Sequence, residues 1–253
     1  MARPKKQWGQ NFLRNRGAVG RIVEAVEPQP DELIVEIGPG EGVLTERLVE
    51  FPNELMAIEI DPELAEKLRS RFGDRVNVIN DDATETPLPP RPYRAVGNLP
   101  YNVGTPILRR VIASTNWRRA VFMLQKEVAD RLVAKPRDEA YGYLTLYTQL
   151  FARARILMTL EPGSFHPRPK VRSAVVVLEP DRKPFASDAL IDLISAAFRM
   201  RRKKLVNNLT NMPREELLAA MERAGIDANA RAEELSLEEF ARLNAECRMQ
   251  SAD

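Results

Sequence analysis

A short apolar run that leads directly into a glycine-rich turn and a helical pattern constrains this chain more than any other feature. Residues Leu33 to Ile37 read as a buried strand, and Gly38-Pro39-Gly40-Glu41-Gly42 follow at once. Glycines in such a turn let a ligand approach the backbone closely, and the N–H groups of the following helix face that ligand. The turn therefore predicts a strand–turn–helix unit that binds a nucleotide-like ligand.

Two acidic positions extend this predicted site along neighbouring strand ends. Glu59 lies near the end of the second apolar run, about twenty residues after the turn, where a carboxylate can bind both ribose hydroxyls of an adenosine cofactor. Asp82 follows the third apolar run, where a carboxylate can accept a hydrogen bond from the amino group of adenine. A dinucleotide site favours glycine or alanine three positions after Gly40, and Val43 stands there. This makes NAD and FAD less favoured than S-adenosylmethionine as ligands of the predicted site.

Apolar runs alternate with helical patterns through the first two thirds of the chain, which predicts a parallel sheet with crossover helices. The predicted strands are Leu33–Ile37, Leu55–Ile60, Val76–Ile79, Ala95–Val96, Ala120–Leu124, Arg155–Leu160 and Ser173–Leu178. The predicted helices are Leu44–Phe51, Pro62–Phe72, Pro106–Ala113, Lys126–Ala134 and Tyr143–Ala152. The proline-rich segment 161–171 is too short for a crossover helix, so the last two strands should form an antiparallel hairpin. We expect an α/β, Rossmann-like fold with a mostly parallel seven-stranded sheet and an antiparallel last strand.

The character of the sequence changes after Glu179. A polar segment bounded by prolines, 180–184, reads as a linker, and only helical patterns follow it. These are Asp188–Phe198, Lys203–Thr210, Arg214–Ala224 and Leu237–Ala245, with Asp188 and Ser236 as expected N-caps and Gly225 as an expected C-terminal glycine. We therefore expect two domains, 1–180 with the sheet and 181–253 as a small all-α domain.

The composition excludes several classes of protein. A chain of 253 residues with 44% hydrophobic residues is globular rather than disordered. The single cysteine, Cys247, and the single histidine, His166, exclude an internal disulfide, a cysteine-based zinc site and a two-histidine metal site. We expect no metal. The basic start has no signal-peptide pattern and no apolar stretch is long enough for a membrane span, so we expect a cytoplasmic protein with no membrane partner.

Cations gather in three clusters, although the net charge is only +2. A solvated surface is the simpler interpretation of any one cluster. Three of them predict a phosphate-binding surface if folding brings them together. Their members are Arg3, Lys5, Lys6, Arg14 and Arg16; Arg168, Lys170 and Arg172; and Arg199, Arg201, Arg202, Lys203 and Lys204.

The most specific feature is the turn Gly97-Asn98-Leu99-Pro100-Tyr101-Asn102 after the fourth predicted strand. The amino nitrogen N6 of adenine is a poor nucleophile, because its lone pair is delocalised into the ring. Two acceptors on its hydrogens, the Asn98 side-chain oxygen and a backbone carbonyl held by Pro100, can draw the nitrogen toward tetrahedral geometry. Tyr101 can stack on the base. This chemistry requires no general base of matched pKa.

Asn98-Leu99-Pro100-Tyr101 resembles motif IV of the S-adenosylmethionine-dependent amino-methyltransferases. With four further motifs it resembles the KsgA-type (RsmA) ribosomal RNA adenine dimethyltransferases across nearly the whole chain. Those motifs are Gly9-Gln10-Asn11-Phe12-Leu13, Glu36-Ile37-Gly38-Pro39-Gly40, Leu124-Gln125-Lys126-Glu127-Val128 and Phe165-His166-Pro167-Arg168-Pro169-Lys170-Val171. The segments 173–176 and 198–209 extend the similarity.

The resemblance implies dimethylation at N6 of two adjacent adenosines near the 3′ end of 16S rRNA, in the immature small (30S) ribosomal subunit, by a monomer. The cofactor S-adenosylmethionine would contact Asn11, Leu13, Gly38, Gly40, Glu59, Ile60, Asp82 and Asn98. Asn98 would also touch the target N6, and Tyr101 and Phe165 would enclose the flipped adenine. The first domain would carry out the transfer and the second would bind rRNA. The cations expected to bind RNA are Arg168, Lys170, Arg201, Arg202 and Lys203.

Three alternatives stay open at this point. An Erm-type 23S rRNA methyltransferase shares these motifs, but motif IV of that family usually has isoleucine where this chain has Leu99. A non-enzymatic RNA-binding assembly factor on the same fold would be expected to lose cofactor contacts, and the expected contacts are present. A dinucleotide oxidoreductase is disfavoured by Val43 and by the turn at Asn98.

Overall fold

The computed structural model describes residues 8, 10–200 and 202–250, and the chain divides into two compact units. The first comprises Met1–Ala129 and Arg153–Pro180, and the second comprises Asp130–Ala152 and Asp181–Asp253. None of the helices in the described residues is both long and apolar enough to cross a membrane.

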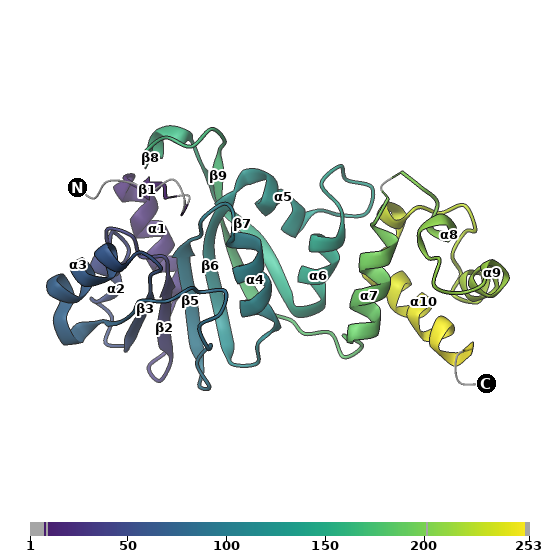
Figure 1. Cartoon of the computed structure of the whole chain (residues 1–253), viewed down its shortest axis with the longest axis horizontal. Coiled ribbons are helices and arrows are strands. Elements are labelled where there is room, and N and C mark those ends of the chain that lie inside the picture. The colour runs from purple at the N-terminus through teal and green to yellow at the C-terminus, as the bar shows by residue number, and fades with distance from the viewer. Residues whose placement is uncertain (1–7, 9, 201, 251–253) are drawn as a thin grey trace. The chain divides into compact units, whose positions relative to one another are not determined.

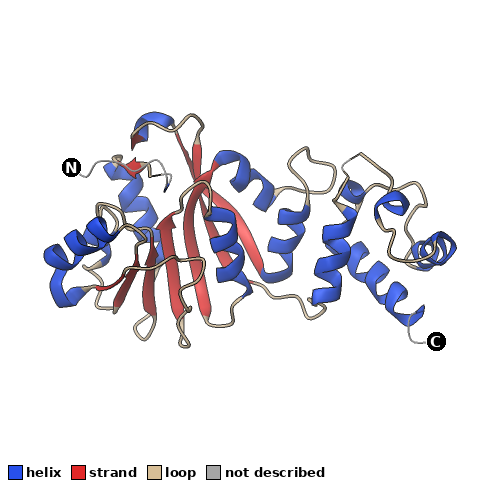
Figure 2. Cartoon of the chain, in the orientation of Figure 1, coloured by secondary structure: helices blue, strands red, loops and turns tan. Residues whose placement is uncertain are grey.

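The first unit is built on a seven-stranded sheet in the order β4-β3-β2-β5-β6-β9-β7 (Figures 1 and 2). The pairs β4–β3, β3–β2, β2–β5 and β5–β6 are parallel, and β9 pairs antiparallel with β6. The α/β prediction and the antiparallel last strand are therefore confirmed. The strands are β2 Leu33–Ile37, β3 Leu55–Ile58, β4 Asn77–Ile79, β5 Tyr93–Asn98, β6 Trp117–Gln125, β7 Ala152–Leu160 and β9 Ser173–Pro180.

Helices cover both faces of this sheet. In Figure 1, α4 (Gly104–Ala113) lies in front of the sheet and α1 (Arg16–Val26) lies behind it, where α1 contacts β5 and β6. The helix α3 (Pro62–Phe72) is capped by Asp61, whose side chain accepts the Glu63 N–H. The short helix α2 (Thr45–Leu48) follows β2 and precedes β3 in the sequence. The sequence analysis did not predict α1, although its apolar side chains join those of β2, β6 and β9 in one buried core.

A second, two-stranded sheet joins segments far apart in the sequence. Its strands β1 (Phe12–Leu13) and β8 (Phe165–His166) pair antiparallel, with Phe12 opposite His166 and Leu13 opposite Phe165. Figure 1 shows the two strands next to each other. This pairing attaches the N-terminal segment to the loop between β7 and β9.

The second unit is helical. It contains α6 Tyr143–Phe151, α7 Asp188–Ala197, α8 Leu205–Asn208, α9 Arg214–Arg223 and α10 Leu237–Gln250, and α5 (Lys126–Val133) enters it from the first unit. The division differs from the predicted domains, 1–180 and 181–253, because residues 130–152 group with the C-terminal helices. Ring contacts and a hydrogen bond explain this grouping. Tyr141 packs edge-on against Phe198 with 6.3 Å between ring centroids, and its hydroxyl donates to the Leu235 carbonyl over 2.7 Å.

Two local predictions in this unit are wrong by a few residues. Ser187 rather than Asp188 caps α7, because the Ser187 hydroxyl accepts the Leu190 N–H. The helix predicted from Lys203 to Thr210 starts later than expected, because α8 begins only at Leu205. Arg202 lies in the turn before it and has a φ of +70°. Ser236 does cap α10, since its hydroxyl accepts the Glu239 N–H at 3.2 Å.

Candidate active site and cofactor pocket

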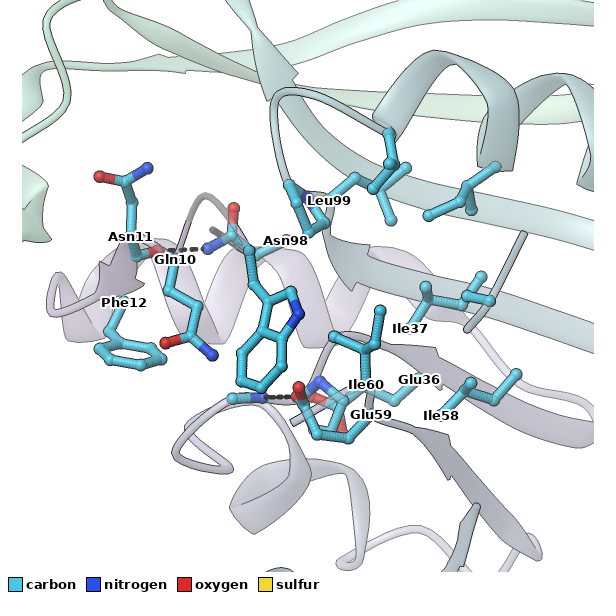
Figure 3. A pocket seen from close by; sticks show the side chains of 18 of the residues that line it. Gln10, Asn11, Phe12, Glu36, Ile37, Ile58, Glu59, Ile60, Asn98 and Leu99 are labelled. Atoms are coloured by element: carbon cyan, nitrogen blue, oxygen red, sulfur yellow. Dashed lines mark hydrogen bonds between the residues drawn. The ribbon is translucent and has the colours of Figure 1, made fainter. Parts of the chain in front are cut away.

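The candidate site is a pocket at the carboxyl ends of β2, β3 and β5, beside the N-terminal segment (Figure 3). The glycine-rich turn after β2 forms one wall. Nine of the predicted residues line the pocket: Asn11, Leu13, Gly38, Gly40, Glu59, Ile60, Asp82, Asn98 and Tyr101. The strand ends that the sequence analysis treated separately therefore meet in one place, as expected for a doubly wound sheet.

The turn depends on two glycines in the left-handed region. Gly38 has a φ of +67° and Gly40 a φ of +58°, which L-residues with a side chain rarely adopt. A Cβ on Gly40 would also lie only 3.0 Å from Cε1 of Phe12. The Phe12 ring, from β1, thus packs directly on the turn and holds the N-terminal segment against the pocket.

Glu59 is fixed at the end of β3 by backbone donors. Its carboxylate accepts the Gly40 N–H at 2.9 Å and the Asp61 N–H at 3.0 Å, and its side chain is only 4% exposed. Burial raises the pKa of Glu59 above its ordinary value, while these hydrogen bonds counteract the shift. The carboxylate therefore connects the glycine turn to the start of α3 while facing the pocket.

Asp82 and Ile60 form the far side of the pocket. One Asp82 oxygen accepts both the backbone N–H and the hydroxyl of Thr84, each at 2.8 Å, which fixes the carboxylate at the end of β4. Ile60 is 39% exposed, which is unusual for a large apolar side chain in this protein. An apolar side chain beside a carboxylate suits a flat heterocycle that carries an amino group.

Glu36 was not predicted as a site residue, and it is the most deeply buried acid in the pocket. The residue is 1% exposed, and one carboxyl oxygen accepts the Thr45 hydroxyl at 2.6 Å. The other oxygen, Oε1, has no hydrogen-bond partner among the residues that the structure describes. Burial raises the pKa of Glu36 to about 8. The sequence feature that could have identified Glu36 is its position as an acid inside an otherwise apolar strand, Leu33 to Ile37.

The pocket lining carries several acidic side chains. Among the described residues, the lining contains no lysine, arginine or histidine. One of its acids is paired, since Glu41 forms an ion pair with Arg14 at 2.7 Å. The remaining acids face a cavity that suits a cationic ligand. The acidic side chains of the lining are Glu36, Glu41, Glu59, Asp81 and Asp82.

Asn98 lies at the end of β5, and its amide has a defined orientation. Its Nδ2 donates to the Asn11 carbonyl over 2.7 Å, so its Oδ1 points away from Asn11 (Figure 3). The preceding Gly97 allows this placement, because a Cβ there would lie 2.3 Å from the Ile37 carbonyl oxygen. The Pro100 carbonyl accepts the Gly104 N–H at 2.8 Å and begins α4. An oriented acceptor thus sits on a rigid turn.

Tyr101 and Phe165 have different environments. The Tyr101 hydroxyl hydrogen-bonds the Ser173 hydroxyl at 2.8 Å, and burial raises the pKa of Tyr101. Phe165, by contrast, is 3% exposed, belongs to the buried core and does not line the pocket. Leu13, its partner in the β1–β8 pairing, does line the pocket.

The predicted RNA-binding cations lie in both units. Arg168 and Lys170 are exposed on the segment between β8 and β9, and Arg202 and Lys203 are exposed in the turn before α8. Arg201 lies outside the described residues. In the part of the chain that the structure describes, no three His, Cys, Asp or Glu side chains gather as a metal site would require.

The comparisons with known proteins agree with one another on the type of protein that this chain resembles. The family described as ribosomal RNA adenine dimethylase matches residues 1–248. The ribosomal RNA small subunit methyltransferase A of Methylococcus capsulatus is 44% identical over 252 residues, covering 95% of this chain and 96% of that protein. The protein of the same name from Hahella chejuensis is 40% identical, covering 94% of this chain and 91% of the relative.

Two solved structures share the fold over nearly the whole chain. A dimethyladenosine transferase from Plasmodium falciparum has a TM-score of 0.85 at 25% identity, covering 95% of this chain and 98% of that one. The 23S rRNA methyltransferase ErmE has a TM-score of 0.73 at 29% identity, covering 94% of this chain and 100% of that one.

Proposed function

Because the chain belongs to the ribosomal RNA adenine dimethylase family, we propose that it dimethylates N6 of two adjacent adenosines near the 3′ end of 16S rRNA. The methyl donor is S-adenosylmethionine and the substrate is the immature small ribosomal subunit. The observation that carries the proposal is the oriented amide of Asn98 beside an acid-lined pocket. The protein would work as a monomer in the cytoplasm, where subunits are assembled.

The pocket residues fit this donor. S-adenosylmethionine supplies an electrophilic methyl group on a positively charged sulfur, and the described lining offers acids without a competing cation. Glu59 would hold the ribose hydroxyls, while Ile60 and Asp82 would contact the adenine ring and its amino group. The positive-φ turn at Gly38 and Gly40 would leave room for the methionine part. Asn11 and Leu13 would cover the donor from the N-terminal segment.

The chain's own residues would prepare the acceptor nitrogen. With its Nδ2 bound to the Asn11 carbonyl, Asn98 has Oδ1 available to accept one N6 hydrogen. The Leu99 carbonyl, directly before Pro100, would accept the other, and both bonds favour a tetrahedral nitrogen with a free lone pair. This stabilisation acts mainly in the transition state. For each transfer the N6–CH₃ bond forms, the S–CH₃ bond breaks, and one N6 proton passes to water.

Tyr101 would stack on the extruded adenine, with its ring held by Ser173. The exposed cations Arg168, Lys170, Arg202 and Lys203, together with Arg201, would bind rRNA phosphates. Such contacts position the RNA without reading its sequence.

The Erm-type alternative rests on the likeness to ErmE. The small-subunit function is favoured because curated relatives that span at least nine tenths of this chain carry that name. Leu99 supports the same choice.

The test is methylation in vitro of small and large subunits from a strain that lacks the endogenous small-subunit enzyme. With labelled S-adenosylmethionine, we expect label at two adjacent adenosines of 16S rRNA and none in 23S rRNA. Label in 23S rRNA would support the Erm-type alternative. No incorporation by a folded protein that binds S-adenosylmethionine would contradict the enzymatic proposal.

A further inference from the structure

Glu36 is a buried acid in an apolar strand, and its side chain accepts a hydrogen bond from the Thr45 hydroxyl. The residue stands in the middle of the sheet, opposite Ala57 of β3 and Val96 of β5, and all five residues of β2 are buried. Glu36 lines the pocket, and its Oε1 is unpaired within the described part of the chain. A buried polar atom without a partner costs free energy, so its presence suggests a partner that the described residues do not supply.

The surroundings of Glu36 oppose a negative charge. The strongest influence is burial. Glu59, which directly follows β3, adds like-charge repulsion, and Asp61 in turn repels Glu59. The hydroxyl of Thr45 on α2 provides the counteracting hydrogen bond. None of these groups is cationic, and neither is any described residue of the lining. A neutral Glu36 is therefore the stable form near pH 7 when no cation is bound.

We propose that Glu36 exchanges a proton as the pocket changes its ligand: it loses the proton to solvent when the cationic methyl donor binds and regains one when the uncharged thioether product remains. This inference rests on the proposed function. During transfer the sulfonium charge disappears, because the S–CH₃ bond breaks as the N6–CH₃ bond forms and an N6 proton leaves. Glu36 then takes one proton from water. The anionic form favours the donor, so the pocket distinguishes the donor from the product by charge.

Isothermal titration calorimetry of the full chain tests the proposal. S-adenosylmethionine and S-adenosylhomocysteine are titrated at pH 7 in two buffers of different ionisation enthalpy, which gives the protons released on binding. For the wild type we expect release of roughly one proton with the methionine ligand and clearly less with the homocysteine ligand. In Glu36→Gln this release should be lost. The preference for S-adenosylmethionine should fall about tenfold.

Two further variants sharpen the result. Thr45→Val removes the hydrogen bond that favours the anion, so proton release should persist to higher pH than in the wild type; this variant decides the question if Glu36→Gln does not fold. Glu46→Gln, which changes the neighbouring exposed acid of α2, is the matched control and should release protons as the wild type does.

Equal proton release in wild type and Glu36→Gln, with both folded, would overturn the inference but leave the proposed function intact. Failure of the folded wild type to bind S-adenosylmethionine would overturn both. Unchanged pH dependence in Thr45→Val would also contradict the role of Glu36.

Discussion

The side-chain amide of Asn98 donates a 2.7 Å hydrogen bond to the backbone carbonyl of Asn11, which lies 87 residues earlier in the chain. A carbonyl can only accept, so it must face the nitrogen of the amide and not the oxygen. The N-terminal segment thereby fixes the orientation of the amide, with Oδ1 facing away from Asn11.

Substitution of Asn98 should abolish transfer without weakening RNA binding. We expect Asn98→Ala to lower the rate of methyl incorporation by about 10²–10³, as for other lost transition-state acceptors and donors. Asn98→Asp should be no better, because a carboxylate oxygen would face the Asn11 carbonyl. The rates are measured on under-methylated small subunits, with filter binding as the control. Activity within a few-fold of wild type would remove Asn98 from the mechanism.

Glu59→Ala should weaken binding of S-adenosylmethionine by roughly tenfold to over a hundredfold, about 1.5–3 kcal/mol. The reason is the loss of the proposed paired contact with the ribose hydroxyls. Because Glu59 also accepts the Gly40 N–H, thermal melting must confirm that the variant is folded. Glu63→Gln, on the exposed surface of α3, is the control acid. Unchanged affinity by calorimetry in a folded Glu59→Ala protein would contradict the assignment.

The Tyr101–Ser173 hydrogen bond should contribute to transfer through the position of the Tyr101 ring. We expect Ser173→Ala and Tyr101→Phe each to reduce kcat a few-fold to about tenfold, with unchanged affinity for S-adenosylmethionine. The double variant should lose little more than either single variant, since the two residues share one interaction. Additive losses in this double-mutant cycle would show that the hydrogen bond has no such role.

The raised pKa of Glu36 should make the protein less stable as pH rises. The folded state holds the proton up to about pH 8, against an ordinary value of 4.5, so it binds more protons than the unfolded chain between these values. The free energy of unfolding must then decrease with pH across this window, by roughly 3–5 kcal/mol in total from this group. Glu59 acts in the same direction. Urea unfolding at pH 5 and pH 8 should show a smaller decrease in Glu36→Gln than in wild type.

Charge reversal of Arg201, Arg202 and Lys203 to Glu should weaken binding to small subunits while leaving the affinity for S-adenosylmethionine unchanged. Phosphate contacts act through counterion release, so the defect should shrink as salt rises. The matched control reverses Arg47, Lys67 and Arg75, exposed cations of the first unit. If the first triple variant binds as wild type does at low salt, the cluster is only a solvated surface.

Features that depend on the local sequence pattern could be predicted. Features that depend on contacts between residues far apart in the chain could not. β2 and α3 were predicted residue for residue, because an unbroken apolar run and a Pro start after an Asp cap are strong signals. The helix α1 was not predicted, because its two glycines lower its helix propensity and its stability comes from packing on the sheet. Predicted α8 was too long, because only four residues are helical.

The same contrast between local and long-range features applies to the candidate site. The strand-end residues Glu59, Asp82 and Asn98 followed from topology, since parallel strands end at one edge. The contacts that orient them did not, because Asn11 and Ser173 lie 87 and 72 residues from their partners. Glu36 was overlooked because inside a strand it reads as part of the apolar run.

The position of β9 determines when during synthesis the site can exist. This strand leaves the ribosome after β7, yet it lies between β6 and β7 in the finished sheet. A nascent chain that stops before Ser173 has no strand between β6 and β7, and Tyr101 lacks its hydroxyl partner. The first strand, β1, likewise waits for β8, about 150 residues later. The site of this rRNA-modifying enzyme is thus incomplete until at least about seven tenths of the chain has been translated.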